Sequence, residues 1–511
     1  LLVGVGLWVS RTKKGHTKTA EDYFLASKAL PWWAIGSSLI AANISAEQFI
    51  GMSGSGFAGG LAIASYEFMA ALTLIIVGKF FLPIFIKQGI YTIPEFVEKR
   101  FSTNLKTILA VFWIALFVFV NLTSVLFLGG KAIDTIVGVG DGSMIVPAII
   151  ALAIFAAAYS LYGGLSAVAW TDVIQVALLV IGGIITTLIA LHYVTPDGGI
   201  LNGISHIADA ASDKFDMVLS RDNKEFNNLP GIYVLIGGLW VANLYYWGFN
   251  QYIIQRTLAA KSLTEAQRGI AFAAFLKMLI PFIVVIPGIV AWVMYSEDLY
   301  GARSAYPWLI STFIPVGVKG LVLAALAAAI VSSLASMLNS TSTIFTMDIY
   351  KPYINREASQ TKLVNVGRLT AGIALIIAVC LAPLLGGIDQ MFQYIQEYTG
   401  LVSPGILAVF LMGLFWKKAT NKGAIWGVLC SIPIALIFKL LPLEMPFMDQ
   451  MFYATLLTIV VIFMVSLSSN PADDDPKAIK LTADMFKTDK VFNICAYIIC
   501  ILLVVIYTAF F

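Results

Sequence analysis

Residues 37–48 read SSLIAANISAEQ, and residues 240–251 read WVANLYYWGFNQ. Both runs place Ala-Asn, followed by Ile or Leu, near the middle of a segment long enough to cross a bilayer. A polar group exposed to hydrocarbon is costly, so broken helices at this depth are expected to line a cavity. Paired interrupted helices in the two halves of a membrane chain point to the binding site of a transporter. The two runs therefore predict a carrier.

The composition is that of a membrane protein. The 511 residues are 59% hydrophobic and 12% charged, whereas an ordinary soluble domain contains roughly 25% charged residues. Such a composition is expected when many helices of about 20 residues each cross a bilayer. The net charge of +3 gives no case for nucleic-acid binding, and the four cysteines all lie in apolar segments, which argues against a disulfide framework.

Thirteen segments are predicted to span the membrane, at residues 33–55, 60–86, 105–130, 144–162, 165–193, 231–254, 267–296, 316–346, 364–385, 388–415, 422–441, 447–468 and 491–511. Residues 1–10 read like the end of another helix, so we expect the stub of a truncated first span, which makes about 14 helices. A cleaved signal peptide is the alternative interpretation of this stub.

Lysine and arginine concentrate in alternate loops. One set comprises Arg11, Lys13, Lys14, Lys18, Lys87, Lys99, Arg100, Lys106, Arg256, Lys261, Arg268, Lys351, Arg356, Lys362, Lys417, Lys418, Lys422, Lys477, Lys480, Lys487 and Lys490. The opposite loops carry little beyond Lys131, Lys214, Arg221, Lys224 and Arg303. By the positive-inside rule the first set is cytoplasmic. The prediction is a multi-pass protein of the plasma (bacterial inner) membrane with both termini outside.

The spans divide into two groups of five. Because five is odd, a second copy of the first group must enter the membrane from the opposite side, which makes an inverted repeat with a broken helix at the start of each half. The predicted units are a stub and cytoplasmic loop at 1–30, a first repeat at 31–193, an external loop at 194–229, a second repeat at 230–416 and three peripheral helices at 417–511. Residues 470–490, with Asp473–Asp475, are predicted to form a solvated linker, with disorder as the alternative.

A cation site is expected at the first break. Hard cations such as Na⁺ prefer oxygen ligands, and an unwound helix frees backbone carbonyls at residues 41–45 to supply them. Residues 329–333 read AIVSS in the middle of an otherwise apolar span. Small residues allow this helix to approach its neighbours closely, and the hydroxyls of Ser332 and Ser333 are candidates to complete the shell. The alternative is that both hydroxyls bond back to carbonyls one turn earlier in their own helix.

The core spans carry ionisable and amide groups at Gln48, Glu67, Asp172, Asn243, Lys277, Gln396 and Glu397, and charges there are expected to face a cavity or to pair with each other. A solute site is expected from five of them, namely Glu67, Lys277 and the amides of Gln48, Asn243 and Gln396. Their mixture of donors and acceptors with little net charge suits a neutral polyhydroxyl ligand. An acidic ligand would require an arginine near mid-depth, and we expect none there. Helix–helix hydrogen bonding is the alternative role for each group.

Aromatic side chains complete this set. Tyr245, Tyr246 and Trp247 follow Asn243, and Phe392 lies one turn before Gln396. The apolar face of a sugar ring stacks on such rings, so Tyr246 is a candidate to close the site on its cytoplasmic side. Ordinary packing is the alternative.

At these residues the chain resembles the sodium/solute symporter family, and in particular its sugar-transporting branch. The similarity covers nearly the whole length and is carried by residues 22–33, 43–48, 162–172, 243–255, 329–339 and 393–400. The run Tyr162-Gly163-Gly164-Leu165 is specific to the family, and the break and the Gln396 region resemble the sugar branch.

The resemblance implies the leucine-transporter fold, alternating access and two sets of site residues. The implied Na⁺ ligands are the carbonyls of Ala41, Ile44 and Ala329 and the hydroxyls of Ser332 and Ser333. The implied sugar ligands are Gln48, Glu67, Asn243, Lys277 and Gln396, with Tyr246 as inner gate and Met52, Tyr66 and Phe392 as outer gate. Asp172 is implied to help Na⁺ leave toward the cytoplasm.

Two departures from the family pattern bear on function. The sugar branch has Ser at the position of Ala70, where its hydroxyl reaches the sugar, so affinity or selectivity among hexoses is expected to differ. Another branch uses a second Na⁺ site with a hydroxyl at the position of Ala335, which Ala cannot supply. One Na⁺ per sugar is therefore expected.

The resulting prediction is a symporter that moves Na⁺ and a hexose (galactose or glucose) inward together, without covalent chemistry. Its expected partners are the sugar, sodium and membrane lipid, with no nucleic acid and no obligate protein partner. A symporter of the same fold for myo-inositol or an amino acid is the nearest alternative, and a solute sensor or channel is a more distant one. No enzyme is expected, because no His/Cys/Asp cluster with metal or nucleophile spacing occurs in the core spans.

Overall fold

A computed structural model describes residues 2–9, 11, 18–45, 47–137, 140–195, 198–295, 305–387, 391–441, 445–469 and 475–511. Part of the first basic loop (12–17), Ala46, Arg303 and most of the acidic run of the last linker (470–474) lie outside these residues. The described residues are helical and contain no strand; a single bridge joins Leu30 to Ala260.

The first half of the chain forms the helices α1 (Leu2–Val9), α2 (Ala20–Phe24), α3 (Trp32–Asn43), α4 (Ser53–Gly59), α5 (Ser65–Ile76), α6 (Leu82–Gln88), α7 (Ile93–Arg100), α8 (Thr103–Ala115), α9 (Thr123–Ile136), α10 (Ile145–Gly163), α11 (Leu165–Tyr193) and α12 (Ile200–Ala210). π-helical turns at Glu47–Met52, Val77–Phe81 and Leu116–Leu122 join several of them.

The second half forms the helices α13 (Tyr233–Ile236), α14 (Gly238–Phe249), α15 (Gln251–Leu258), α16 (Leu263–Tyr295), α17 (Ala305–Phe313), α18 (Val316–Ile344), α19 (Gln360–Leu381), α20 (Met391–Phe415), α21 (Asn421–Leu440), α22 (Phe447–Ser468) and α23 (Lys490–Ala509). A π-helical segment at Phe345–Ile354 extends α18.

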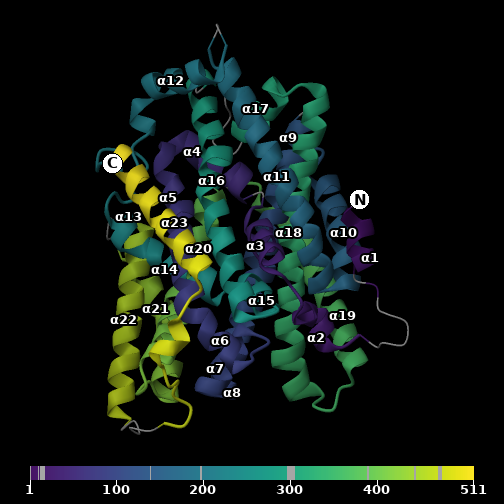
Figure 1. Cartoon of the computed structure of the whole chain (residues 1–511), viewed down its shortest axis with the longest axis vertical. Helices are drawn as coiled ribbons and strands as arrows, with labels where there is room; N and C mark the ends of the chain where they lie inside the picture. Colours follow the sequence, from purple (N-terminus) through teal and green to yellow (C-terminus); the bar gives the residue numbers. More distant parts are fainter. Residues whose placement is uncertain are drawn as a thin grey trace.

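The helices form one upright bundle (Figure 1), with α12 at one end and α6 and α7 at the other. Within the described residues, eleven helical stretches are long and apolar enough to cross a membrane. The two remaining predicted spans are the interrupted ones. The first comprises α3 and then α4, which already belongs to the stretch Glu47–Gln88, and the second comprises α14 and α15. The thirteen predicted spans therefore all correspond to helices.

Both predicted breaks exist, but they fall at different places relative to the Ala-Asn pairs. In the first run, α3 ends at Asn43, and Ile44 is extended with φ −78° and ψ 107°. In the second run, α14 continues through Asn243 to Phe249, and the extended residue is Asn250, with φ −80° and ψ 124°. The expectation that the two runs break at matching places is wrong, because the second helix continues past Asn243 for another turn and a half.

The family-specific run at 162–165 forms the tight turn between α10 and α11. Gly164 adopts φ +67°, a conformation that L side chains rarely adopt. A Cβ at this position would lie 2.3 Å from the carbonyl oxygen of Tyr23, so the turn also lets the backbone of α2 approach closely. The positive φ and the close contact both require glycine at position 164.

The broken helix α3 packs closely against α16. A Cβ added at Gly36 would lie 2.6 Å from the carbonyl oxygen of Gly269, and one at Gly288 would lie 2.1 Å from that of Ser53. Glycines at these points let the backbones approach, as is common between membrane helices. The close packing brings the first break beside the middle of α16, which carries Lys277.

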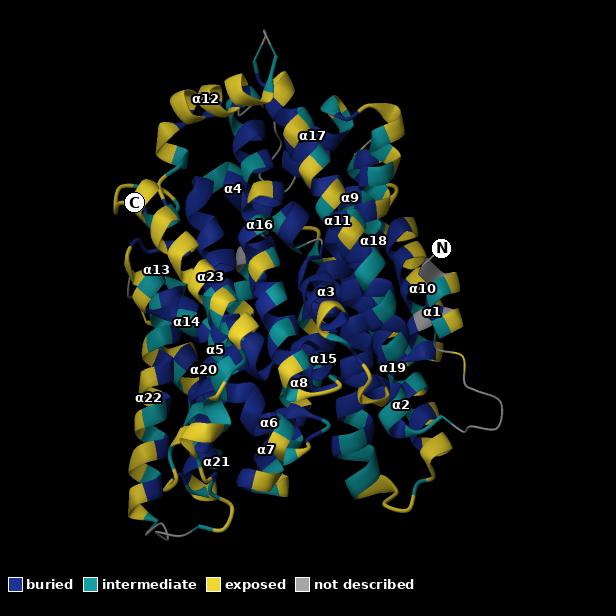
Figure 2. Ribbon diagram, viewed as in Figure 1, coloured by how far each residue is buried: buried dark blue, intermediate teal, exposed yellow. Residues whose placement is uncertain are grey.

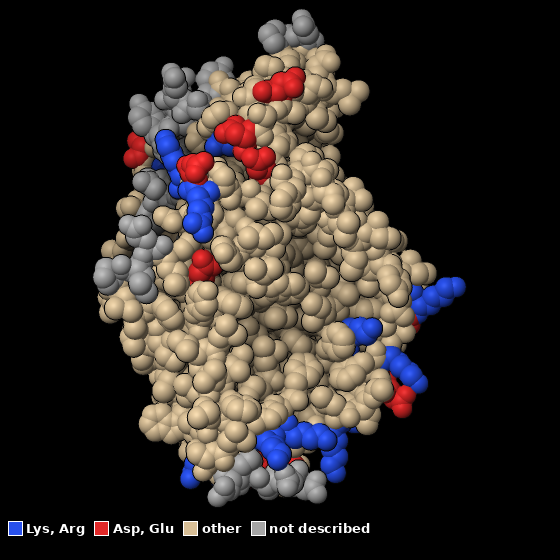
Figure 3. Space-filling model, turned by 90° about the vertical axis from the view of Figure 1, so that its left-hand side faces the viewer, with Lys and Arg blue, Asp and Glu red and all other residues tan. Residues whose placement is uncertain are grey.

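Burial and charge follow the membrane pattern. Buried residues fill the centre around α3, α16 and α18, whereas α22 and α23 are exposed along their outer faces (Figure 2). The space-filling view in Figure 3 shows a broad band without charged residues between charged ends. The backbone of Phe510 accepts a hydrogen bond from Met217 at 2.7 Å, so the end of the described chain lies beside the loop that carries α12.

Candidate functional site

A polar cavity lies between the two broken helices. Its volume is about 60 Å³, and its lining comes from α3, α5, α14, α16, α20, α22 and the π-helical turn at 47–52. The lining residues are Asn43, Glu47, Gln48, Tyr66, Glu67, Ala70, Ala242, Asn243, Tyr245, Tyr246, Trp247, Lys277, Phe392, Gln396, Thr399, Gly400, Ser403 and Met451. All five residues predicted to bind the solute are among them.

Lys277 occupies the centre of this cavity. Its side chain is 1% exposed; its ammonium forms an ion pair with the Glu67 carboxylate and donates to Oδ1 of Asn43. The ammonium also lies 5.1 Å from the ring centroid of Trp247, within the range of a cation–π contact. A charge this deep in a membrane protein requires a partner, and here the pair joins α16, α5 and the first break.

The amides of the cavity differ in how much of their hydrogen-bonding capacity they use. Oε1 of Gln48 accepts from the backbone N–H of Ser45 at 3.0 Å, so Gln48 supports the unwound turn. Nδ2 of Asn243 donates to the carbonyl of Leu239 at 3.1 Å in its own helix, which leaves its Oδ1 as an acceptor at the cavity. Both amides therefore retain groups that a ligand can use.

Aromatic contacts close the cavity in both directions. Toward the α12 end, the rings of Tyr66 and Phe392 meet edge to face with centroids 5.2 Å apart. Toward the opposite end, the hydroxyl of Tyr246 accepts from Asn43 at 3.0 Å and from the Tyr252 hydroxyl at 2.6 Å. Met52, predicted as part of the outer gate, is fully buried and is not among the lining residues.

The first break frees the backbone carbonyls that the ion site needs. In a continuous helix the N–H groups of Ser45 and Gln48 would bond to the carbonyls of Ala41 and Ile44. Instead the Ser45 N–H donates to the Gln48 side chain, and the Gln48 N–H donates to the carbonyl of Ser45. The carbonyls of Ala41 and Ile44 thus lose their helical donors.

The two predicted hydroxyls approach this break from α18. Ser333 donates to the carbonyl of Ala42 at 3.0 Å, and Ser332 donates to Asp172 at 2.5 Å. The alternative that both bond back within their own helix is wrong, because both reach other helices. Ala329 lies one turn before Ser333 on the same helix, where its carbonyl retains a second lone pair.

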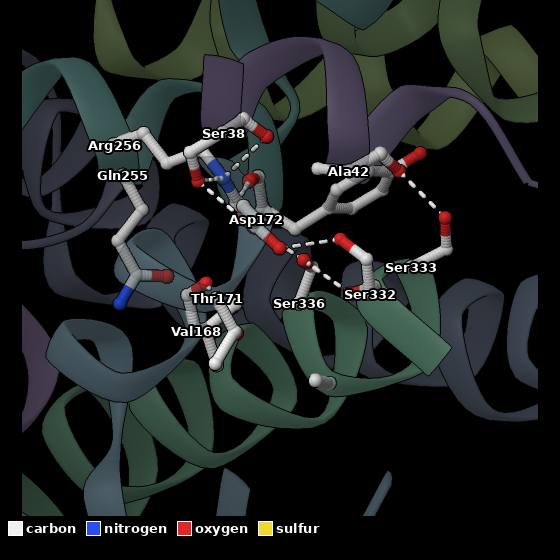
Figure 4. A network of polar contacts seen from close by, with 12 residues as sticks. Ser38, Ala42, Val168, Thr171, Asp172, Gln255, Arg256, Ser332, Ser333 and Ser336 are labelled. Atoms are coloured by element: carbon white, nitrogen blue, oxygen red, sulfur yellow. Dashed lines mark hydrogen bonds and ion pairs between the residues drawn. The ribbon is translucent and has the colours of Figure 1, made fainter. Parts of the chain in front are cut away.

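Asp172 is the centre of a buried network shown in Figure 4. It accepts from Ser38 of α3 and Ser332 of α18, and Arg256 of α15 lies 3.4 Å from it. Arg256 also donates to Ser38 and Ser336. Four helices, including parts of both broken ones, therefore meet at one carboxylate beside the predicted ion site.

Arg256 corrects an expectation from the sequence. It lies in α15, is 1% exposed and is bonded within the bundle, so it is not the loop residue that the charge pattern predicted. Glu397 is half-exposed and pairs with Lys439 at 3.0 Å, so it belongs to an ion pair and not to the cavity. No local signal marked the burial of Arg256, because its partners Ser38, Asp172 and Ser336 are remote in sequence.

Two residues of the site were not predicted as ligands. Asn43 bonds both Lys277 and Tyr246, and Glu47 lines the cavity with a buried Oε1 that has no hydrogen-bond partner among the described residues. Both belong to the quoted run SSLIAANISAEQ. Sequence reasoning marked this run as the break but did not assign these side chains.

Solute-type and ion-type groups share one helix break, and aromatic contacts close the solute cavity toward both ends of the bundle. This arrangement defines a secondary active transporter that couples a solute to an ion.

Comparison with known proteins identifies the family. A model of the sodium:solute symporter family matches residues 23–431. A sodium/glucose cotransporter of Vibrio parahaemolyticus is 65% identical, covering 100% of this chain and 96% of the relative. Sodium/myo-inositol cotransporter 2 of Homo sapiens is 33% identical, with 85% of this chain and 67% of the relative covered. This chain belongs to the sodium:solute symporter family.

A solved structure supports the fold. The substrate-bound, outward-open structure of a Na⁺-coupled sialic acid symporter is similar to this chain with a TM-score of 0.80 at 25% identity, covering 92% of this chain and 96% of the other. The leucine-transporter fold expected from the sequence is confirmed, and Na⁺ is the coupling ion of the family.

Proposed function

We propose that this protein carries Na⁺ and a hexose, galactose or glucose, into the cell together. The observation that carries the proposal is the mid-membrane cavity lined by Gln48, Glu67, Asn243, Lys277 and Gln396. These groups offer donors and acceptors to sugar hydroxyls, while the internal pairing of Lys277 with Glu67 leaves little net charge. The high identity to a relative named as a sodium/glucose cotransporter supports the same solute class.

Binding requires the cavity to open. Its volume is about 60 Å³ and contacts of aromatic residues close it toward both ends of the bundle, so a solute reaches it only when one of these closures opens. Separation of Tyr66 from Phe392 opens the cavity toward the α12 end, and release of Tyr246 from Asn43 opens it toward the other end. We therefore assign Tyr66 and Phe392, with Met52 behind them, to the outer gate and Tyr246 to the inner gate.

Sodium acts at the first break in this proposal. Carbonyls of Ala41, Ile44 and Ala329 with the hydroxyls of Ser332 and Ser333 form its ligand set, and Asp172 receives the ion on its way to the cytoplasm. A bound ion ties α3 to α18, and Gln48 and Asn43 on the same break then meet the sugar in a fixed geometry. Coupling follows because each ligand favours the ordering that the other needs.

The driving force is sufficient for accumulation. A membrane potential of ~100 mV supplies ~2.3 kcal/mol per charge, and a tenfold Na⁺ gradient adds ~1.4 kcal/mol. At one Na⁺ per sugar, which the alanine at position 335 supports, the sum permits an accumulation of roughly several hundred-fold.

We place the basic loops in the cytoplasm of a bacterial cell, so that both termini lie on the external side of the inner membrane. The repeat units are 31–193 and 230–416, with the other segments peripheral to them. The transporter works by conformational change without covalent chemistry, surrounded by lipid and without an obligate protein partner.

A second candidate solute is myo-inositol, because a human relative of that name covers most of this chain. Its ring of hydroxyls presents the same kind of donors and acceptors as a hexose. Competition by myo-inositol against labelled galactose distinguishes the two candidates, since a hexose carrier is inhibited much more strongly by galactose or glucose.

The decisive experiment is uptake of radiolabelled galactose into proteoliposomes, with an inward Na⁺ or K⁺ gradient, by wild type and Ser333→Ala. Uptake driven by Na⁺ alone and lost in the variant is expected. Ser431→Ala is the matched control, because its buried hydroxyl bonds back within peripheral helix α21. Equal uptake in both gradients refutes the coupling, and full activity of Ser333→Ala refutes the ion site.

A further inference from the structure

A groove of about 520 Å³ lies between α16, α23 and the start of α3, away from the transport cavity. It is lined by Trp32, Arg268, Ala271, Phe272, Phe275, Val491, Cys495, Ile498 and Ile499. Phe275, Val491 and Ile498 are each 45–48% exposed, so the groove opens on the outer surface of the bundle. On a membrane protein this surface faces lipid.

The groove has a polar end and an apolar floor. Arg268 lies near the beginning of α16, close to the basic loops, whereas Phe272, Phe275 and Ile498 lie further into the membrane band. From Arg268 to Phe275, and from Val491 to Ile499, the helices rise ~10–12 Å. The hydrocarbon of one leaflet is ~15 Å thick, so the groove spans most of one leaflet.

The polar end holds two cations, Arg268 and Lys490, and two carboxylates, Asp489 and Glu265, each of which accepts hydrogen bonds from within the protein. Nε and Nη2 of Arg268 donate to Asp489 at 2.7 and 2.6 Å, and the other oxygen of Asp489 caps α23 through the Phe492 N–H at 3.1 Å. An arginine has five N–H donors, so Arg268, whose side chain is 36% exposed, retains donors for a further anion. Lys490 follows Asp489 directly and is exposed. The Asp489 carboxylate is thus occupied internally, while both cations remain accessible.

Trp32 marks the level of the membrane interface at this end. Its ring contacts Phe272 edge to face with centroids 5.5 Å apart, and its backbone N–H donates to Glu265 at 2.7 Å. Tryptophan is enriched where headgroups meet hydrocarbon. Trp32 therefore places Arg268 and Lys490 at headgroup depth and the floor of the groove at acyl-chain depth.

We propose that this groove binds an anionic phospholipid of the cytoplasmic leaflet, with its phosphate beside Arg268 and Lys490 and an acyl chain along the apolar floor. Water does not fill a large apolar groove that opens to hydrocarbon, and a basic pocket between helices on the cytoplasmic side suits an anionic headgroup. The bound lipid touches Phe272, which packs on Gly36 of the broken helix α3 on its other side. The site thereby connects lipid composition to the helix that holds the proposed ion site.

The test is native mass spectrometry of the purified full chain with phosphatidylglycerol or phosphatidylcholine of identical acyl chains. Wild type is expected to retain phosphatidylglycerol preferentially. Since a basic residue near an anionic lipid surface contributes ~1 kcal/mol, Arg268→Gln and Lys490→Gln are each expected to weaken binding about fivefold. Lys490→Gln keeps the Arg268–Asp489 pair, so it tests the site even where Arg268→Gln impairs folding.

Lys362→Gln is the matched control, because it removes an exposed basic residue from the same side of the bundle, at the start of α19. Competition with glycerol phosphate distinguishes a lipid site from a site for free phosphate. At millimolar concentration, glycerol phosphate is expected not to displace the bound phosphatidylglycerol. Equal retention of both lipids by wild type, an equal loss in the Lys362→Gln control, or displacement by glycerol phosphate overturns the proposal. The readout is binding, so these outcomes are independent of whether the transported solute is a hexose.

Discussion

The pair formed by Lys277 and Glu67 allows the clearest quantitative test of the solute site. Their side chains are 1% and 4% exposed, so Lys277→Met leaves the Glu67 carboxylate buried without its counter-ion. Removing one partner of a buried pair costs about 3–5 kcal/mol. With an unfolding entropy of ~2.1 cal/mol/K per residue, the 511 residues give ~1 kcal/mol/K. The expected fall in Tm is therefore about 3–5 °C.

The double variant Lys277→Met/Glu67→Gln removes both charges, so its Tm is expected to return to within about 1 °C of wild type. Galactose uptake should be lost in both variants, because the cavity no longer contains the ammonium donor of Lys277. Thermal unfolding in detergent at one heating rate measures Tm, and proteoliposome uptake measures transport.

The control is Lys439→Gln, which breaks the half-exposed pair with Glu397 and should lower Tm by less than about 1 °C. The reasoning is refuted if Lys277→Met alone unfolds at the wild-type temperature. It is also refuted if the falls in Tm measured for Lys277→Met and for Glu67→Gln alone simply add in the double variant.

Three further predictions concern the ion network, the inner closure and the solute. Arg256→Gln leaves the Asp172 carboxylate without its cation, so Na⁺-driven uptake should fall more than tenfold. The double variant Arg256→Gln/Asp172→Asn removes both charges and should restore Tm but not uptake. Recovery of uptake in the double variant would contradict the role of the network. Tyr246→Phe removes the hydroxyl that bonds Asn43, so efflux from preloaded proteoliposomes should rise up to about tenfold, and an unchanged rate would exclude Tyr246 as the inner gate. Ala70→Ser adds a hydroxyl to the cavity lining and should lower the galactose KM about fivefold, which an unchanged KM would contradict.

The spans could be predicted from the sequence because hydrocarbon imposes a strong local requirement. A segment of about 20 apolar residues satisfies its own backbone hydrogen bonds as a helix whatever its neighbours are. For the same reason the run at 37–48 could be recognised as a break. The position of the second break could not be predicted, because α14 remains helical through Asn243 and the sequence does not display the packing contacts of this helix.

Arg256 shows where local reasoning about charge fails. It lies among residues that resemble a basic loop, and the positive-inside rule counts it there. Its burial depends on Asp172, Ser38 and Ser336, which are remote in sequence and come together only in the folded bundle. A charge is retained in the core when such partners exist, and no local pattern reports them.

The sequence by itself determined the helical membrane class, the number of spans and the family, because these depend on composition, segment length and short motifs. Only the tertiary structure decided that Lys277 pairs with Glu67 and also bonds Asn43, that Ser333 reaches the carbonyl of Ala42, and that Arg256 faces Asp172. Hydrogen bonds and ion pairs act over a few ångströms, so they are set by which helices the fold brings into contact.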